Sequence, residues 1–229
     1  MNSQTVELLK QTSLFRDLDD DVLELLAKRA TERTLSRGEL LFLGGEPASG
    51  LYVIAEGSVR AFRSGIDGRE QVIHVERAVT TVAELPVFDN GAYPSSVAAE
   101  EPTRVFFIQK EDIRQACLKH PQLALAATKL LAGRLRRCAE LVESLSLREV
   151  GQRVGKLLLV EAGTKGVKVE DGIAFKQSLT HNELAARIGT VREVVTRALT
   201  RLQDQGMIKV EGKTVIVRDQ DALRAYVDA

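Results

Sequence analysis

The sequence predicts an α+β protein with an N-terminal antiparallel β-roll of the jelly-roll type, a long helix and a C-terminal winged helix-turn-helix. Three observations indicate this fold: short β-prone runs across residues 39–108, a helical period across residues 111–148, and two short helices followed by a hairpin after residue 179. We therefore expect three parts, a β-roll at 1–120, a dimerisation helix at 121–148 and a winged helix at 149–229.

The N-terminal part is expected to begin with two helices within residues 5–30. Asp19, Asp20 and Asp21 place negative charge where the second of these helices would begin, which favours its N-terminus. The following β-prone runs are ELLFL, LYVIA, VRAF, QVIHV, SSVAA and RVFFI, and turn-forming segments such as GGEPASG and SGIDG separate them. Short strands at close spacing are typical of a barrel, sandwich or jelly roll.

The long helical segment has an apolar stripe that repeats every four and three residues. Pro121 is expected to lie in its first turn, where proline is tolerated. The stripe comprises Leu131, Leu135, Cys138, Val142 and Leu145. Such a stripe is consistent either with a helix lying on its own core or with the a/d seam of a coiled-coil dimer. Charges border it closely on both sides, which favours the dimer seam.

The C-terminal part is expected to contain a helix at 150–163, a loop with the sequence TKGVKVEDG, and the helix-turn-helix. Thr180 and Glu183 form a capping-box pattern that opens a short helix, and Gly189 ends it. A second helix is expected over residues 191–205, and Gly206 ends it. The sequence IKVEGKTVIV then predicts a two-stranded wing that turns at Glu211 and Gly212.

The second helix of this motif carries residue types suited to reading DNA bases. Its expected outward face has Arg192, Glu193, Thr196 and Arg197. Arginine can hydrogen-bond O6 and N7 of guanine, and glutamate can accept from the cytosine amino group. Candidate contacts to the DNA backbone are Thr180, His181, Arg201 and Lys213. A single exposed arginine is usually only solvated, but the capped helix, this polar face and the basic wing together indicate DNA binding.

Composition excludes several other classes. Two cysteines cannot build a disulfide framework or a four-thiolate metal site. No apolar run is long enough to span a bilayer and no secretory leader is visible, so we expect a cytoplasmic protein. The three histidines lie far apart and no catalytic motif is present, so we expect no enzyme activity. A β-roll that binds a ligand or metal, or catalyses a reaction, without any DNA function remains the alternative.

Several motifs in one order resemble the Crp/Fnr superfamily of transcription regulators (the cyclic-AMP receptor protein and fumarate–nitrate reductase regulator type). They lie at residues 14–27, 37–62 and 83–103 and in the helix-turn-helix and wing. The resemblance implies a β-roll sensor, a homodimer, and RNA polymerase as a partner. Arg192, Glu193 and Arg197 match the family's base-reading positions, which implies a two-fold palindrome with TGA at the core of each half-site.

The resemblance also implies an effector pocket, for which the candidate residues are Glu84, Leu85, Ser95, Ser96, Arg134 and Cys138. Ala83 and Pro86 stand where cyclic-AMP-binding relatives have glycine, and Pro94 stands where they have arginine. These changes disfavour cyclic AMP, because a Cβ blocks close approach of the backbone and proline lacks an N–H donor. No cysteine precedes Cys117, which excludes the family's N-terminal iron–sulfur centre. Haem ligation by His74 and redox sensing by cysteine are weaker alternatives, and the effector stays open.

Overall fold

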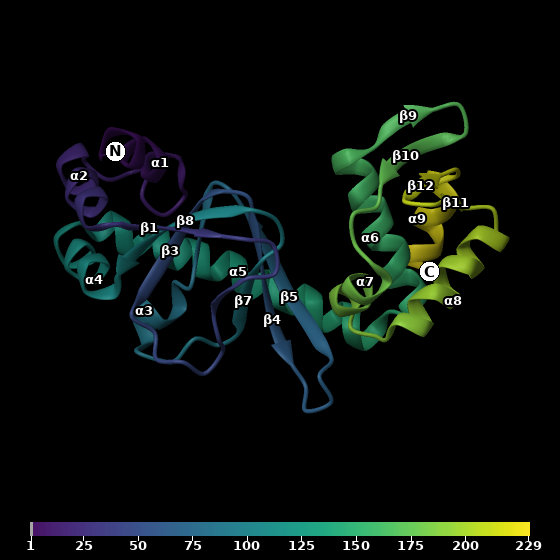
Figure 1. Cartoon of the computed structure of the whole chain (residues 1–229), viewed down its shortest axis with the longest axis horizontal. Helices are drawn as coiled ribbons and strands as arrows, with labels where there is room; N and C mark the ends of the chain where they lie inside the picture. Colours follow the sequence, from purple (N-terminus) through teal and green to yellow (C-terminus); the bar gives the residue numbers. More distant parts are fainter. Residues whose placement is uncertain (1) are drawn as a thin grey trace. The chain divides into compact units, whose positions relative to one another are not determined.

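The computed structural model describes residues 2–229, which form two compact units (Figure 1). The first unit comprises the chain up to Arg63 together with Ile73–Cys138, and the second comprises Ser64–Val72 together with Ala139–Ala229. The division between the units thus lies inside the long helix. No helix in the described part of the chain is long and apolar enough to cross a membrane.

The N-terminal half combines short helices with two four-stranded sheets, ordered β1-β8-β3-β6 and β2-β7-β4-β5. Its elements are α1 (Asn2–Gln11), α2 (Asp20–Arg29), β1 (Thr31–Leu35), β2 (Leu40–Phe42), β3 (Gly50–Glu56), β4 (Ser58–Ser64), β5 (Glu70–Arg77), β6 (Thr80–Val82), α3 (Leu85–Asp89), β7 (Ser96–Ala99), β8 (Thr103–Gln109) and α4 (Lys110–Lys119). The six expected strands are present, whereas β1, β6 and α3 had no clear signal in the sequence pattern.

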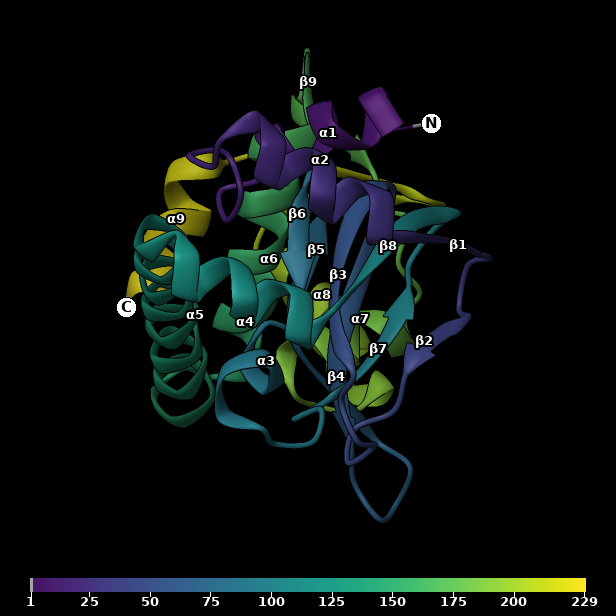
Figure 2. The same ribbon diagram turned by 90° about the vertical axis from the view of Figure 1, so that its left-hand side faces the viewer.

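Both faces of strand β3 are buried, which explains why its sequence is apolar almost throughout. Val53 packs with the helices α1, α2 and α4, whereas its neighbour Ile54 packs with residues of the second sheet. Successive side chains on a strand point to opposite faces, so one strand can serve two cores. Figure 2 shows α1 and α2 at one end of β3 and β8. In the core between the sheets, the rings of Phe42 and Tyr93 stack with 3.8 Å between centroids.

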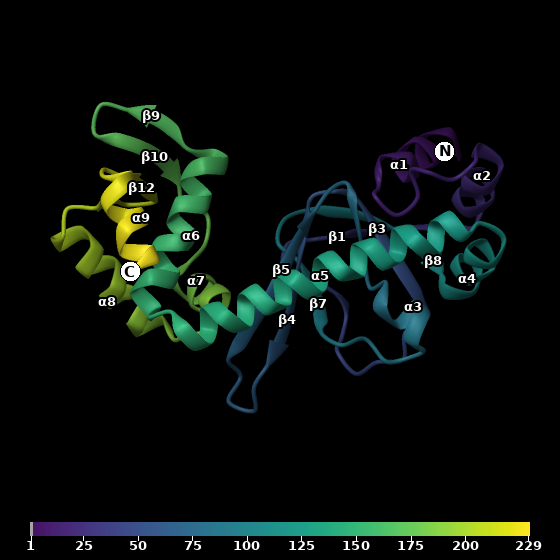
Figure 3. The ribbon, with the colours of Figure 1, turned by 180° about the vertical axis from the view of Figure 1, so that it is seen from behind.

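The long helix α5 (Pro121–Leu147) begins at proline, as expected, because a first-turn residue has no intrahelical partner for its N–H (Figure 3). The preceding helix α4 is separate, since His120 lies between the two. Leu123 and Ala127 are buried in the core of the first unit. Further along, Leu135 is 72% exposed and Val142 is 63% exposed. The C-terminal half of α5 therefore presents an apolar stripe that its own chain leaves uncovered.

The second unit contains one four-stranded sheet, ordered β11-β12-β10-β9, with helices around it. Its elements are α6 (Val150–Lys165), β9 (Val167–Val169), β10 (Gly172–Lys176), α7 (His181–Ile188), α8 (Arg192–Asp204), β11 (Ile208–Glu211), β12 (Thr214–Val217) and α9 (Gln220–Asp228). The segment TKGVKVEDG was expected to be a loop, which is wrong in part. Its valines form edge strand β9, which pairs with β10. Gly172 at the start of β10 has φ +132° and lies against the Val217 carbonyl, where no Cβ would fit.

Candidate nucleic-acid interface and effector cavity

The first helix of the helix-turn-helix, α7, is fixed at both ends by its own sequence. The Thr180 hydroxyl accepts a hydrogen bond from the Glu183 amide at 3.2 Å, and the Glu183 carboxylate accepts one from the Thr180 amide at 2.6 Å. Gly189 follows the helix with φ +70°, a left-handed conformation that suits glycine. The capping box and the helix-ending glycine predicted from the sequence are thus confirmed. They fix where α7 begins and ends, and α8 follows after a short turn.

Helix α8 buries one face and exposes the other. Val195, Leu199 and Leu202 are buried in the core of the second unit. All four candidate base-reading residues, Arg192, Glu193, Thr196 and Arg197, are exposed, and so is Arg201. Within residues 2–229, none of the three arginines has an ion-pair partner in the chain. This free basic face at the start of α8 is what a phosphate-rich ligand requires.

A hydrogen-bond chain connects α7 to this exposed face. His181 Nδ1 lies 2.9 Å from Thr196 Oγ1, and the Thr196 hydroxyl donates to the Arg192 carbonyl oxygen at 3.1 Å. The wing is fixed as well, because the Gln177 amide donates to the Lys213 carbonyl oxygen at 2.7 Å. The candidate backbone contacts Thr180, His181 and Lys213 therefore lie on segments that hydrogen bonds hold in place.

In the β-roll, the structure brings two of the six candidate pocket residues into direct contact. Glu84 is completely buried, and its carboxylate lies 2.6 Å from Arg134 Nη1 and accepts from Arg134 Nη2 at 3.0 Å. The same Nη2 donates to the Thr81 carbonyl oxygen. Removing two charges from water is costly, and the ion pair together with its hydrogen bond offsets part of that cost. Glu84 therefore serves as the anchor of α5 in this structure.

The other four candidates are in different surroundings. The Ser96 hydroxyl accepts from the Gly44 amide at 3.0 Å, and Ser95 is buried. Leu85 is 42% exposed and Cys138 is exposed on α5. The backbone of Ala83 has φ +67°, a left-handed conformation that glycine would adopt without strain.

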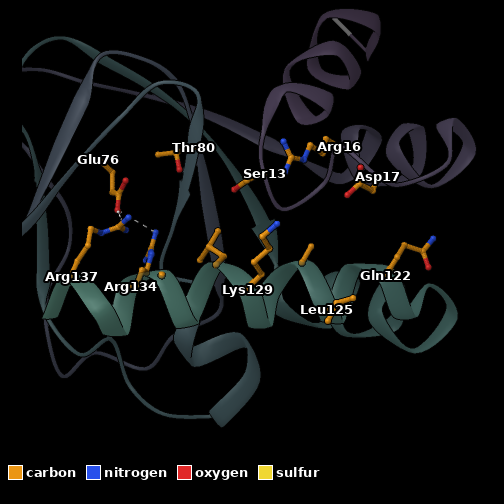
Figure 4. A pocket seen from close by; sticks show the side chains of 13 residues that line it. Ser13, Arg16, Asp17, Glu76, Thr80, Gln122, Leu125, Lys129, Arg134 and Arg137 are labelled. Carbon is orange, nitrogen blue, oxygen red and sulfur yellow. Dashed lines mark hydrogen bonds and ion pairs between the residues drawn. The ribbon is translucent and has the colours of Figure 1, made fainter. Parts of the chain in front are cut away.

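A cavity of about 420 Å³ lies in the first unit, beside α5 (Figure 4). It is lined by Ser13, Arg16 and Asp17 between α1 and α2, by Glu76 and Thr80, and by one face of α5 between Gln122 and Arg137. Of the six candidates only Arg134 reaches it. The α5 residues at this wall recur at helical spacing, a signal visible in the sequence. The contribution of Ser13 and Arg16 is not visible there, because only the tertiary fold brings the α1–α2 segment to α5.

Charged side chains cluster at one end of this cavity. Glu76 Oε1 lies 3.0 Å from Arg137 Nη2 and 3.8 Å from Arg134 Nη2. Burial raises the pKa of the Glu76 carboxyl, and the two arginines oppose that rise. Burial, together with the charges of Arg134 and Arg137, lowers the pKa of His74 to about 4. Across residues 2–229 no three His, Cys, Asp or Glu side chains gather where they could hold a metal ion.

A β-roll unit joined to a winged helix with a free basic recognition face defines a DNA-binding transcription regulator. Comparison with known families agrees: residues 32–120 match the cyclic nucleotide-binding domain and residues 152–226 match the Crp-like helix-turn-helix domain. The chain belongs to the Crp/Fnr family of transcription regulators. This confirms the predicted family and α+β fold class, and it excludes the alternative of a β-roll enzyme, because the relatives are regulators.

Individual relatives cover nearly the whole chain. It is 30% identical over 217 residues to a CRP-like cAMP-activated global transcriptional regulator of Mycobacterium tuberculosis, covering 95% of this chain and 97% of that one. It is 27% identical to the global nitrogen regulator of Synechococcus elongatus, covering 92% and 94% of the two chains. The solved structure of the c-di-GMP-responsive regulator CLP of Xanthomonas campestris has a TM-score of 0.77 at 22% identity, covering 88% and 100%. The names of these relatives refer to different signals.

Proposed function

We propose that this regulator binds, as a homodimer, a two-fold DNA palindrome with TGA at the core of each half-site. The observation that carries the proposal is the exposed start of α8, where Arg192, Glu193 and Arg197 have no ion-pair partner within the described chain. Arginine can donate hydrogen bonds to guanine, and glutamate can accept one from the amino group of cytosine on the paired strand. The three residues can therefore recognise a short core that contains G·C pairs. The basic wing residue Lys213 adds a sequence-independent phosphate contact.

The homodimer follows from the apolar stripe on α5. Leu135 and Val142 are exposed by more than half, and exposed apolar side chains in a heptad row indicate a partner helix. A second copy is the simplest partner, since a two-fold dimer would place two α8 helices about 34 Å apart, one turn of DNA. RNA polymerase as a further partner and action in the cytoplasm are supported by the family to which the chain belongs.

Cyclic AMP is not the effector in this proposal. The pocket segment has no arginine or lysine between Arg77 and Arg104. Arg134 is already engaged by buried Glu84, so a phosphate there would have to compete with that ion pair. Isothermal titration with cyclic AMP is expected to show no saturable binding, and tight binding would contradict this part of the proposal.

Binding to labelled duplexes tests the DNA proposal. Fluorescence anisotropy is expected to show at least about 1000-fold preference for a TGA-containing inverted repeat over a scrambled duplex, measured at one fixed salt concentration. Equal affinity for both duplexes would refute the proposal. Leu135→Asp is expected to give a monomer in size-exclusion chromatography with light scattering and to lose the preference. Leu125→Asp is the matched control, since Leu125 lies on the same helix and is 71% exposed against 72% for Leu135.

A further inference from the structure

The cavity beside α5 is distinct from the pocket that the family resemblance indicates. Of the six candidate pocket residues it shares only Arg134; its other walls come from the α1–α2 segment, the β5–β6 region and α5. All of these residues belong to the first unit. We propose that this cavity is a second ligand site, and that it binds a small phosphorylated sugar or polyol.

The charge of the lining favours an anion. Four cationic side chains line the cavity with two carboxylates. Arg137 is paired with Glu76, and Arg134 is paired with buried Glu84 outside the lining, which leaves two cations, Arg16 and Lys129, for a ligand. Arg16 and Lys129 have no ion-pair or hydrogen-bond partner for their side chains among residues 2–229. These two unused cationic side chains line the cavity and can donate hydrogen bonds to the oxygens of an anion.

The donor types favour phosphate at one end of the ligand. Figure 4 shows Ser13, Arg16 and Lys129 reaching into the same space from opposite walls, the first two from the α1–α2 segment and the third from α5. A guanidinium, an ammonium and a hydroxyl together offer more donors than a planar carboxylate can accept, whereas a phosphate has three oxygens to receive them. Asp17 is the second carboxylate of the lining, and Figure 4 shows its side chain apart from those of Ser13 and Lys129.

The remaining walls favour a hydroxyl-rich body. Gln122, Thr80 and the carboxylate of Glu76 can exchange hydrogen bonds with hydroxyl groups. Leu125, Ala126 and Leu130 also line the cavity and can contact the carbon skeleton of the ligand. None of the 13 lining side chains is aromatic, so the cavity lacks the stacking surface that a nucleobase would use. Its volume of about 420 Å³ is within the range of small-molecule sites and exceeds what a bare phosphate ion needs.

The site is compatible with the proposed dimer. Successive helix residues are about 100° apart, so Lys129 and Gly133 lie about 160° around α5 from Leu131 of the apolar stripe. A partner helix on the stripe would therefore leave the cavity open. A ligand bound there would bridge the α1–α2 segment to α5.

Isothermal titration of the full-length protein tests this site without DNA, so the result is independent of the DNA proposal. The probes are ribose 5-phosphate, glucose 6-phosphate and glycerol 3-phosphate, with ribose, 2-oxoglutarate and cyclic AMP as comparisons. At least one sugar or polyol phosphate is expected to bind once per chain with Kd below about 1 mM, and ribose is not expected to bind. The proposal is overturned if none of the three phosphates binds with a Kd below about 1 mM, even if 2-oxoglutarate or cyclic AMP does.

Three single substitutions locate the site. Arg16→Gln and Lys129→Gln should each raise the Kd about tenfold or more, because each removes a charge-assisted contact. Lys119→Gln is the matched control: Lys119 is also exposed, belongs to the same unit and lies outside the cavity. It should leave the Kd unchanged. Arg16 and Lys129 are exposed, so folding should survive, which the melting temperature checks. Equal Kd values in all three variants and the unmodified protein would place the ligand elsewhere and overturn the proposal.

Discussion

His181 Nδ1 lies 2.9 Å from Thr196 Oγ1, so the first helix of the helix-turn-helix touches the exposed face of the second. The Thr196 hydroxyl has one hydrogen, which it donates to the Arg192 carbonyl oxygen. The hydroxyl must then accept from His181, whose Nδ1 carries the hydrogen. This contact fixes the orientation of a side chain at the centre of the proposed base-reading surface.

The first prediction concerns this contact. His181→Ala should weaken binding to the preferred palindrome by about 0.5–1.5 kcal/mol, the usual net contribution of one hydrogen bond. Thr196→Ala should have a comparable effect, and the double variant should lose less than the sum. A coupling energy of at least about 0.5 kcal/mol in this double-mutant cycle is expected from anisotropy measurements. Strictly additive losses would show that the two side chains act independently on DNA.

The second prediction concerns base reading. Arg197→Ala should cost about 1–3 kcal/mol on the preferred palindrome and relax the preference at one base pair. The measurement is a set of duplexes with single substitutions in each half-site. Arg224→Ala is the control, because Arg224 is an exposed helix arginine of the same unit that lies on α9. An equal loss on preferred and random duplexes would mean that Arg197 contacts only phosphate.

A third prediction tests the turn before α8. Gly189 has φ +70°, and a Cβ added there would lie 2.6 Å from Leu145 Cδ2. Gly189→Ala should therefore lower the free energy of unfolding by about 1–2 kcal/mol or more. Gly163→Ala in α6 is the control, since a Cβ there meets nothing within 4 Å and φ is not positive. It should be neutral or stabilise by up to about 1 kcal/mol in urea unfolding. Equal effects of the two variants would contradict this explanation.

The fourth prediction concerns the buried ion pair that holds α5. Arg134→Met leaves Glu84 buried without a counter-charge and should destabilise the protein by about 3–5 kcal/mol. Combining it with Glu84→Gln should recover much of this loss. Arg137→Met is the matched control, because Arg137 is on the same helix but its side chain is 55% exposed, and it should cost no more than about 1 kcal/mol. Denaturant midpoints compare the four proteins, and a loss below about 1 kcal/mol for Arg134→Met would contradict the prediction.

The fifth prediction follows from His74. Its pKa in the folded protein is about 4, below the ordinary value of 6.5, because burial and two arginines disfavour the charged ring. The unfolded chain therefore takes up a proton first as pH falls, so stability present above about pH 6.5 is lost toward pH 4. The loss is at most about 3 kcal/mol, since His74 is partly exposed.

The variant His74→Gln should flatten this pH dependence between pH 6.5 and 4, because glutamine does not titrate. The raised pKa of Glu76 acts in the opposite direction and is common to both proteins, so their difference isolates the histidine. Thermal unfolding of both proteins at a series of pH values measures this difference in stability. Parallel stability curves for the two proteins would show that His74 takes no part.

Local sequence determined much of the helix-turn-helix. The Thr180–Glu183 capping box, Gly189 and Gly206 each act within one turn of chain, so α7, α8 and their ends could be placed without knowing the rest of the fold. The apolar period of α8 likewise distinguished the buried Val195 and Leu199 from the exposed arginines. Strand β9 was missed because a three-residue edge strand has too few residues for a periodic signal.

Only the tertiary structure decided the buried ion pair and the cavity of the first unit. Arg134 and Glu84 are 50 residues apart, and nothing in the sequence says that their charges neutralise each other in the core. The cavity beside α5 is built from segments more than 100 residues apart, which only the packing of α1, α2 and α5 brings together. Helix ends and amphipathic faces depend on near neighbours in the chain, so the sequence by itself determined them. A cavity built from distant segments depends on long-range packing, which only the tertiary structure decides.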